Sequence, residues 1–345
     1  MRKACRLLCT SPGAAGGGLQ LEYFSPPPLS SGQALVQVLA APIHPADLNA
    51  LEGTYGVRRT PPFVPGNEGV GRVIQVAEDV SLDLVGKKVL LPYGCGSWTS
   101  HLVWDADALL CVPEEIPLPL AAQAQVNPLT ALCLLELASH TAKELGTNGE
   151  VVLAQNAANS AVGLSVIQLA PRFGMRTLNI VRSPQAAKVA AQHGAQLILV
   201  DPQDTLTSSE IQAAAQNPLP VGLNAVGGSS ATTLAGALAE GGTLITYGAM
   251  SRKAMKIPAS FLIFRDIRLQ GFWLQRWFRR TSRQILQEKI DLLLQEMVQL
   301  HFTLPAGPCF SLEQFADALA AATTGHRQGK VFFLPSDSVG KSSPR

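Results

Sequence analysis

Cysteines, charged residues and long apolar runs are all scarce in this chain of 345 residues, and each scarcity excludes a class of protein. The six cysteines are scattered and none forms a Cys-x-x-Cys pair, so we expect reduced thiols and neither a disulfide scaffold nor a structural zinc site. No apolar run reaches the roughly 18 residues of a bilayer span. The richest stretch, 118–137, is interrupted by Gln123, Gln125, Asn127 and Pro128. Membrane insertion is therefore not expected.

The charge balance excludes partners that bind by bulk electrostatic attraction. Only 15% of the residues are charged and the formal net charge is +2, which argues against nucleic acid and membrane surfaces as partners. Hydrophobic residues make up 47% of the chain, as in a globular protein with a large core. The length exceeds the roughly 100–200 residues of one average domain, so we expect two domains.

Residues 1–124 are predicted to form a small, irregular β-barrel. Short β-rich runs are separated there by turns that contain proline and glycine. The clearest runs are 4–8, 34–40, 69–76 and 88–92.

Residues 125–273 change character, because apolar strands alternate with amphipathic helices. This alternation is typical of an α/β fold, a doubly wound parallel sheet that is covered on both faces. The expected strands are 151–154, 177–181, 197–200, 221–226, 243–247 and 267–272, and the expected helices are 164–173, 184–193, 208–216 and 230–239. Residues 274–345 are expected to add helices at 282–300 and 312–323, a strand at 329–334 and a frayed polar tail.

The loop Gln155–Gly163 follows the first strand of the doubly wound segment. Its small residues would let a pyrophosphate approach the backbone and the N-terminus of the next helix, although only Gly163 remains of the G-x-G-x-x-G fingerprint. The second strand ends at Arg182, where an NAD site usually has a carboxylate for the ribose 2′-hydroxyl. A cation there suits the 2′-phosphate of NADPH, and Ser183 adds a hydroxyl. The alternatives are an ordinary turn and a solvated arginine.

Two stretches of the first segment, Ala40–Asn49 and Pro65–Gly71, resemble the medium-chain dehydrogenase/reductase superfamily. Zinc-binding members have a cysteine ligand before the Asp-containing stretch and a histidine ligand before the glutamate. Here those positions hold Ala46 or its neighbours and Asn67, and His44 is a lone candidate. Zinc then lacks its tetrahedral ligand set. The chain therefore resembles the zinc-free branch, and no metal is expected.

Within that branch the chain resembles the mitochondrial trans-2-enoyl thioester reductases along nearly its whole length. The stretches that carry the resemblance are Leu51–Gly56, Val126–Ala131, Gln155–Gly163, Leu223–Gly228, Thr246–Met250 and Leu269–Leu274. The resemblance implies a GroES-like β-barrel catalytic domain formed by residues 1–124 with a return at 274–345, and a Rossmann domain at 125–273 that binds NADPH.

The same resemblance implies a reaction of fatty acid synthesis. Hydride passes from NADPH to the β-carbon of a trans-2-enoyl thioester, and a proton then reaches the α-carbon. Because negative charge moves onto the thioester oxygen, the site needs hydrogen-bond donors and a proton source. Tyr55, in the loop between Gly53 and Gly56, matches the family's catalytic tyrosine. A phenol is protonated at neutral pH, so it can donate.

The resemblance also assigns cofactor residues, partners and a location. The cofactor residues are Asn127, Asn159, Ser160, Ala161, Val162, Arg182, Ser183, Pro184, Tyr247, Gly248, Ala249, Met250, Phe272, Trp273, Leu274, Gln275 and Lys330. The substrate carries coenzyme A or an acyl carrier protein, and the apolar strand 269–274 is expected at a sheet edge that pairs in a homodimer. We expect a soluble intracellular protein, in the mitochondrial matrix of a eukaryote with any presequence absent from this chain, or in bacterial cytoplasm.

Some residues depart from the related pattern. Ala158 and Ala161 stand where the related loop tends to have serine and glycine. Pro171 falls late in the first helix of the nucleotide fold, where a proline removes a hydrogen bond, so we expect this helix to end or kink before Gly174.

A basic cluster near the end of the nucleotide fold suggests a handle for the substrate. Guanidinium groups suit the phosphates of coenzyme A and phosphopantetheine and the carboxylates of a carrier protein. The cluster comprises Arg276, Arg279, Arg280 and Arg283 around Trp277 and Phe278, with Arg58 and Arg59 after the tyrosine loop. A solvated basic turn is the alternative.

Two other functions remain open. A zinc-free quinone or aldehyde reductase would use NADPH but would need no acid at Tyr55. A non-catalytic NADPH-binding protein of structural or regulatory function would share the fold, because a fold does not determine a function.

Overall fold

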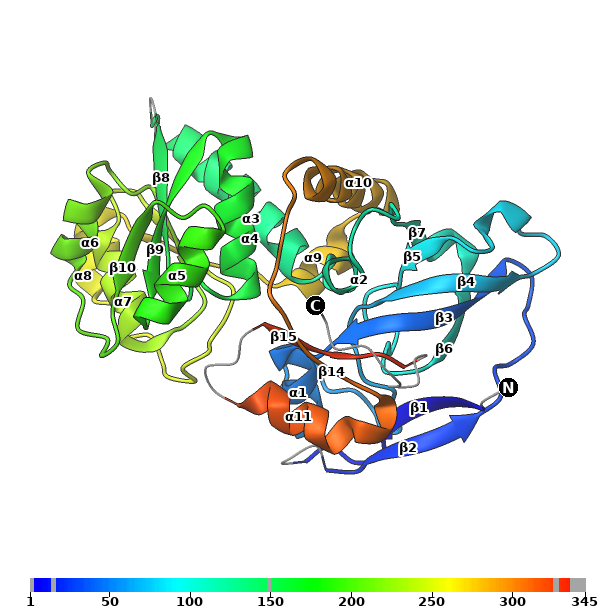
Figure 1. Ribbon diagram of the computed structural model, residues 1–345. Helices are drawn as coiled ribbons and strands as arrows, with labels where there is room; N and C mark the ends of the chain where they lie inside the picture. The colour runs from blue at the N-terminus through cyan, green and yellow to red at the C-terminus, as the bar shows by residue number, and fades with distance from the viewer. Residues whose placement is uncertain (1–2, 14–16, 148–149, 325–328, 336–345) are drawn as a thin grey trace. The chain divides into compact units, whose positions relative to one another are not determined.

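The computed structural model describes the chain except residues 1–2, 14–16, 148–149, 325–328 and 336–345. The polar tail expected at the C-terminus therefore falls outside the described residues from 336 onwards. The chain forms two compact units, Met1–Val126 with Ile290–Arg345, and Asn127–Lys289 (Figure 1). The second unit includes residues 274–289, which the sequence interpretation assigned to the C-terminal return.

The first unit is built on mainly antiparallel strands. Its larger sheet has the order β14-β15-β3-β4-β5-β7, with β6 also paired to β3, while β1 and β2 form a separate pair. The strands are β1 (Ala4–Cys9), β2 (Leu19–Phe24), β3 (Gln33–Pro42), β4 (Val70–Val76), β5 (Lys88–Leu90), β6 (His101–Asp105), β7 (Leu110–Cys111), β14 (Ala306–Phe310) and β15 (Lys330–Phe333). The helices are α1 (Pro45–Glu52), α2 (Leu118–Ala121) and α11 (Phe315–Thr323), and α10 (Arg283–Gln299) crosses the boundary between the units.

Strand β3 organises the larger sheet. Its alternate residues Ala34, Val36 and Val38 are fully buried, which is the period of two expected for a strand with one face on a core. Strand β15, from the end of the chain, pairs antiparallel with β3 and places Phe332 opposite Pro42 (Figure 1, red beside blue). The C-terminal return thus completes the sheet that the N-terminal segment begins.

The second unit contains a sheet of six parallel strands in the order β10-β9-β8-β11-β12-β13. This is the 3-2-1-4-5-6 order of a doubly wound dinucleotide-binding fold, so the predicted fold class is confirmed. The strands are β8 (Val151–Gln155), β9 (Met175–Val181), β10 (Leu197–Val200), β11 (Val221–Asn224), β12 (Thr243–Thr246) and β13 (Arg268–Gly271). The helices are α3 (Asn127–Glu144), α4 (Ala161–Leu169), α5 (Pro184–Gln192), α6 (Ser208–Ala215), α7 (Gly228–Ala237), α8 (Ala259–Arg265) and α9 (Leu274–Arg280).

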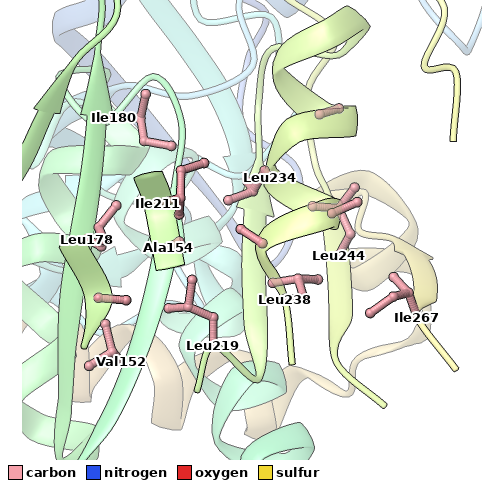
Figure 2. Packing of buried hydrophobic residues seen from close by; sticks show 14 residues of the cluster. Val152, Ala154, Leu178, Ile180, Ile211, Leu219, Leu234, Leu238, Leu244 and Ile267 are labelled. Atoms are coloured by element: carbon pink, nitrogen blue, oxygen red, sulfur yellow. The ribbon is translucent and has the colours of Figure 1, made fainter. Parts of the chain in front are cut away.

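One core joins this sheet to helices α6 and α7. Val152, Leu178 and Leu244 of the strands are fully buried in it (Figure 2). Ile211 of α6 and Leu238, just after α7, complete the same cluster. Helices α3 and α4 pack against each other on the other side of the sheet (Figure 1). Burial on both faces explains why the central strands β8, β11 and β12 are almost continuously apolar, whereas the edge strand β13 is exposed.

The early end of the first nucleotide-fold helix, predicted from Pro171, is confirmed. Helix α4 stops at Leu169, residues Ala170–Phe173 form a 3-10 turn, and Gly174 closes it with a left-handed φ of 65°. Proline has no N–H to continue the α-helical ladder, so the last turn tightens instead.

The prediction that the strand 267–272 extends to Trp273 and Leu274 was wrong. Strand β12 ends at Thr246, which pairs with Gly271, so the ladder has no partner beyond that residue. Trp273 instead forms the N-cap of α9. The sequence interpretation also missed helices α1 and α3. No helix within the described ranges combines the length and apolarity that a bilayer span requires.

Candidate cofactor and catalytic sites

The loop between β8 and α4 turns tightly because of its small residues. Ala157 has a left-handed φ of 50°, and Ser160 caps α4 by accepting a hydrogen bond from the Gly163 N–H at 3.1 Å. A Cβ atom on Gly163 would lie 2.5 Å from the carbonyl oxygen of Ala158. The one glycine that survives from the fingerprint is thus the one that close packing of loop and helix requires.

Two asparagines join the carboxyl ends of β8 and β11, the central strands between which the strand order reverses. Asn156 Nδ2 donates to Asn224 Oδ1 at 2.9 Å, and Asn156 Oδ1 accepts from the Ala225 N–H at 2.7 Å. Both side chains are buried. In doubly wound sheets ligands bind outside the carboxyl ends of the strands at this reversal. The sequence reasoning missed this pair, although an asparagine at the end of each of two apolar strands was a signal for it.

Arg182 directly follows β9 and is exposed. Ser183 caps α5 by accepting a hydrogen bond from the Ala186 N–H at 3.1 Å, so its oxygen is occupied while its O–H can still donate. Pro184 is the first residue of that helix, where its missing N–H costs nothing. The strand end therefore offers a cation and a hydroxyl and no carboxylate.

Four groups of predicted cofactor residues lie at one edge of the sheet in the second unit. They follow the carboxyl ends of β8, β9, β12 and β13, and are 159–162, 182–184, 247–250 and 272–275. The segment after β12 is held against the segment after β11, because Met250 N donates to Ala225 O at 3.0 Å. A Cβ on Gly248 would lie 2.8 Å from the same oxygen, so this approach requires glycine.

Three of the predicted cofactor residues have buried polar atoms that make no well-formed hydrogen bond within the described residues. These atoms are Asn127 Nδ2, the Tyr247 hydroxyl and Gln275 Oε1; Gln123 Oε1 and Gln155 Oε1, outside the predicted set, are in the same state. Buried polar groups are normally satisfied, so such atoms point to a ligand that completes them. Burial raises the pKa of Tyr247 and the nearby Ser160 hydroxyl lowers it by less, so the phenol remains a neutral donor. Amide and phenol groups of this kind fit a nicotinamide dinucleotide.

In the first unit, Tyr55 lies in the turn that follows α1. Gly53 caps the helix with a φ of 75°, and the N–H groups of Thr54 and Tyr55 donate to Asn49 O at 2.9 and 3.1 Å. The Tyr55 side chain is half-buried, and the hydroxyl of Tyr93 hydrogen-bonds to it. Burial raises the pKa of Tyr93 and the contact with Tyr55 raises it further, so Tyr93 stays protonated. Sequence reasoning missed Tyr93 because nothing in its local pattern distinguishes it.

A chain of buried polar side chains contains Lys330. Its Nζ lies 3.2 Å from His44 Nδ1, and His44 Nε2 lies 2.6 Å from Glu68 Oε1. The second oxygen of Glu68 accepts from the Val126 N–H at 2.8 Å. An ammonium group can only donate, so His44 must accept at Nδ1 and carry its proton on Nε2, which then donates to Glu68. Lys330 starts β15, as predicted, but is buried rather than a solvated residue at a strand edge.

Asn67 stands where zinc-binding members of the superfamily have a histidine ligand. Its amide donates to Asp47 Oδ1 at 2.6 Å and accepts from Arg59 Nη2 at 3.0 Å. Within the described ranges, no group of three or more His, Cys, Asp and Glu side chains is arranged to hold a metal ion.

The basic cluster lies on and after α9. Arg276, Arg279, Arg280 and Arg283 are exposed, and residues 267–287 contain no Asp or Glu. The rings of Trp277 and Phe278 meet edge to face at 5.4 Å. Arg59, which the sequence interpretation added to this handle, is directed to Asn67 instead of solvent.

Two family models match the chain. The model described as alcohol dehydrogenase GroES-like domain matches residues 30–114, and the one described as zinc-binding dehydrogenase matches residues 161–293. Together with the larger sheet of each unit, they define a two-domain dehydrogenase/reductase of the medium-chain type.

Curated relatives narrow this class. The mitochondrial enoyl-(acyl-carrier-protein) reductase of Rattus norvegicus is 37% identical over 311 residues, which cover 88% of this chain and 81% of that protein. The protein of the same name from Dictyostelium discoideum is 39% identical over 284 residues, with 80% and 79% covered. The chain belongs to the enoyl-(acyl-carrier-protein) reductase family, and the resemblance found in its sequence is confirmed.

Solved structures share the fold. A putative NADPH:quinone reductase from Bacillus thuringiensis has a TM-score of 0.84 and 26% identity, covering 97% of this chain and 99% of that one. The mitochondrial 2-enoyl thioester reductase heterodimer from Candida tropicalis has a TM-score of 0.84 and 23% identity, covering 97% and 100%.

Proposed function

We propose that this protein reduces trans-2-enoyl thioesters to saturated acyl thioesters with NADPH, as a step of fatty acid synthesis. The observation that carries the proposal is the 37% identity to the Rattus norvegicus reductase across 88% of this chain. It is supported by the phenol in the turn between Gly53 and Gly56, a group that a zinc-free reductase can use as a proton donor.

The proposed cofactor site lies at the carboxyl ends of the parallel strands in the second unit. The bound NADPH would supply the hydride for the β-carbon. The N-terminus of α4 would receive the pyrophosphate, and Arg182 with Ser183 the 2′-phosphate. Asn127, Tyr247 and Gln275 would satisfy their buried polar atoms on the nucleotide. The other residues that the resemblance assigned to the cofactor, Lys330 included, are proposed in the same role.

Tyr55 is the proposed catalytic residue. Its O–H would donate to the thioester oxygen as negative charge develops there, and would stand near the proton that the α-carbon finally receives. Preorganised donors of this kind are typically worth about 10²–10³-fold in rate. Tyr93, which hydrogen-bonds to Tyr55, would fix the orientation of the Tyr55 phenol.

The exposed arginines of the basic cluster are proposed to dock an acyl carrier protein. Carrier proteins are acidic, and four guanidinium groups without an intervening carboxylate form a complementary surface. Charge reversal at Arg279 and Arg280 should raise KM for a carrier-bound enoyl substrate more than for a short mimic that lacks phosphate. Charge reversal at Lys143, exposed on α3 of the same unit, is the control. An equal rise for both substrates would count against docking.

Assembly, location and domain roles complete the proposal. Strand β13 is the exposed edge of the parallel sheet, and Leu269 is 45% exposed there. An edge strand offers unpaired backbone groups, so we propose that β13 pairs with its copy in a homodimer. The location proposed is the mitochondrial matrix in a eukaryote, which the word mitochondrial in the relatives' names supports, or the cytoplasm in a bacterium. Residues 1–124 with 274–345 would carry catalysis, and residues 125–273 would carry NADPH.

A substrate panel tests the proposed reaction. Consumption of NADPH and of NADH would be measured with enoyl thioesters of several chain lengths, on coenzyme A and on carrier protein, and with a benzoquinone. We expect NADPH with enoyl thioesters to be the fastest combination. Quinone reduction in the absence of enoyl reduction would favour the second candidate, a quinone reductase, which the likeness to the Bacillus thuringiensis protein supports.

A further inference from the structure

Asn67 connects three segments of the first unit. Its side-chain Nδ2 donates to Asp47 Oδ1 of α1 at 2.6 Å, and its Oδ1 accepts from Arg59 Nη2 at 3.0 Å. Its backbone oxygen accepts from the Gly94 N–H at 2.7 Å. The side chain is only 5% exposed. All three of these hydrogen bonds of Asn67 therefore go to segments next to a tyrosine. Asp47 and Arg59 lie on either side of Tyr55 in the chain, and Gly94 follows Tyr93.

Arg59 ties down the far end of the Tyr55 turn. It lies four residues after Tyr55, and besides Asn67 its guanidinium reaches Val64 O at 3.3 Å and stacks 5.6 Å from the centre of the Phe63 ring. The near end of the turn is fixed to α1 through Asn49. Asp47 belongs to α1 as well. The hydrogen bonds from Arg59 to Asn67 and from Asn67 to Asp47 therefore attach the end of the turn to α1, the helix that precedes it.

The same residue also fixes the turn that carries Tyr93. Gly94, the next residue, is bound to the Asn67 carbonyl and has a left-handed φ of 78°. The Tyr93 hydroxyl meets Tyr55. One asparagine therefore sets the backbone positions on both sides of the contact between the two phenols.

We propose that Asn67 and Arg59 are positioning residues for Tyr55, and that they act through the hydrogen-bonded chain from Arg59 to Asn67 to Asp47. The inference rests on the proposed function of Tyr55. A misplacement of a reacting group by about 1 Å can cost about 10²-fold in rate. A half-buried phenol in a turn without helix or strand needs such an anchor.

A double-mutant cycle in the full chain tests the proposal. Arg59→Met and Asn67→Leu would each be made alone and together with Tyr55→Phe, and kcat and KM for an enoyl thioester would be measured with the Kd for NADPH. If the two residues act through Tyr55, each single substitution lowers kcat by about 10–100-fold with NADPH affinity unchanged, and neither lowers it further beside Tyr55→Phe. Arg72→Met, which removes an exposed arginine paired with Glu114, is the matched control and should leave kcat unchanged.

Conservative variants keep the test decisive if Asn67→Leu does not fold. Arg59→Lys keeps the charge but loses the fork that reaches two acceptors, so we expect a loss between those of wild type and Arg59→Met. Asn67→Asp keeps an acceptor for Arg59 but sets a second carboxylate against Asp47, with Arg59 and Lys330 as the neighbouring cations. The kcat of Asn67→Asp should recover as pH falls. A proton shared between the introduced carboxylate and Asp47 then restores a hydrogen bond in the place of the one from the Asn67 amide.

Each outcome separates the two claims. Two outcomes would overturn the positioning proposal alone. One is a kcat in the double variants that is reduced by the product of the two single reductions, and the other is an unchanged kcat in folded Arg59→Met. An unchanged rate in Tyr55→Phe itself would overturn the role of Tyr55 and the positioning proposal with it.

Discussion

The Nζ atom of Lys330 lies 3.2 Å from Nδ1 of His44, although 286 residues separate the two in the chain. His44 Nε2 in turn lies 2.6 Å from Glu68 Oε1, so one imidazole joins a buried cation to a buried carboxyl group, whose pKa burial raises well above its usual value. Removal of one member of such a chain leaves the other groups buried and uncompensated, which typically costs about 3–5 kcal/mol.

His44→Leu should therefore lower the free energy of unfolding by about 3–5 kcal/mol, measured by urea denaturation at pH 7. His140→Leu is the matched control, because His140 also pairs with a glutamate, Glu144, but on an exposed helix surface. It should change stability by less than about 0.5 kcal/mol. Equal effects of the two substitutions would contradict the buried charge chain.

The buried carboxyl group of Asp47 should make the free energy of unfolding fall as the pH rises. Burial raises its pKa from 3.8 to about 6, and its hydrogen bonds and the charges of Arg59 and Lys330 offset only part of that rise. The folded state thus holds this proton more tightly than the unfolded state. The resulting stabilisation is complete below pH 4 and is lost as pH rises through about 6.

Wild type should therefore lose about 3 kcal/mol of unfolding free energy relative to Asp47→Asn as the pH rises from 4 to 7, because the variant has no carboxyl group to titrate at this position. Asp79→Asn should show the opposite sign, because hydrogen bonds from Ser31 and Gly32 lower the pKa of that exposed carboxyl. Parallel curves for wild type and Asp47→Asn would refute the assignment.

Arg182 should decide between the two nicotinamide cofactors. A charge-assisted hydrogen bond to a 2′-phosphate is worth about 1.5–3 kcal/mol, so Arg182→Gln should raise the Kd for NADPH by about 10–100-fold. NADH lacks the phosphate, and its Kd should stay the same. Arg176→Gln, on the strand β9 that precedes Arg182 and paired with Glu150, should affect neither. A similar loss of affinity for both cofactors would exclude a phosphate contact.

Gly163 should not tolerate a methyl group. A Cβ there would meet the backbone of Ala158 at 2.5–2.7 Å, so Gly163→Ala must displace the loop and should destabilise the protein by about 1–3 kcal/mol. NADPH affinity should fall with it, as equilibrium binding would show. Gly13→Ala, whose Cβ would have no neighbour closer than 4.0 Å, serves as the control. Unchanged NADPH binding in Gly163→Ala would place the nucleotide elsewhere.

The fold could be predicted from the sequence because its evidence is local. Apolar strands alternate with helices at regular spacing in residues 151–272, and this alternation predicted the doubly wound parallel sheet. The order of its strands was not predicted. Pro171 gave the early end of α4 by the same local reasoning. The strand end at Gly271 was not predictable, since it depends on where the neighbouring strand β12 stops.

The candidate site was predictable only where a residue type is itself informative. Arg182 was found by its charge and Tyr55 by its resemblance to a family. The contacts around Tyr55 were not found, because Asn67 meets Asp47 and Arg59 only in the folded chain, and His44 meets Lys330 across 286 residues. Nothing in a single sequence shows that such polar residues share one buried cluster.

Analysis of the reaction product is the most direct test of the proposed activity. The protein would be incubated with NADPH and crotonyl-CoA, and the acyl thioester and the remaining cofactor would both be quantified. We predict one saturated acyl thioester formed for each NADPH consumed, at a rate that falls about 100-fold in Tyr55→Phe. Crotonyl-CoA that remains unreduced by the folded protein, with NADPH left intact, would contradict the account.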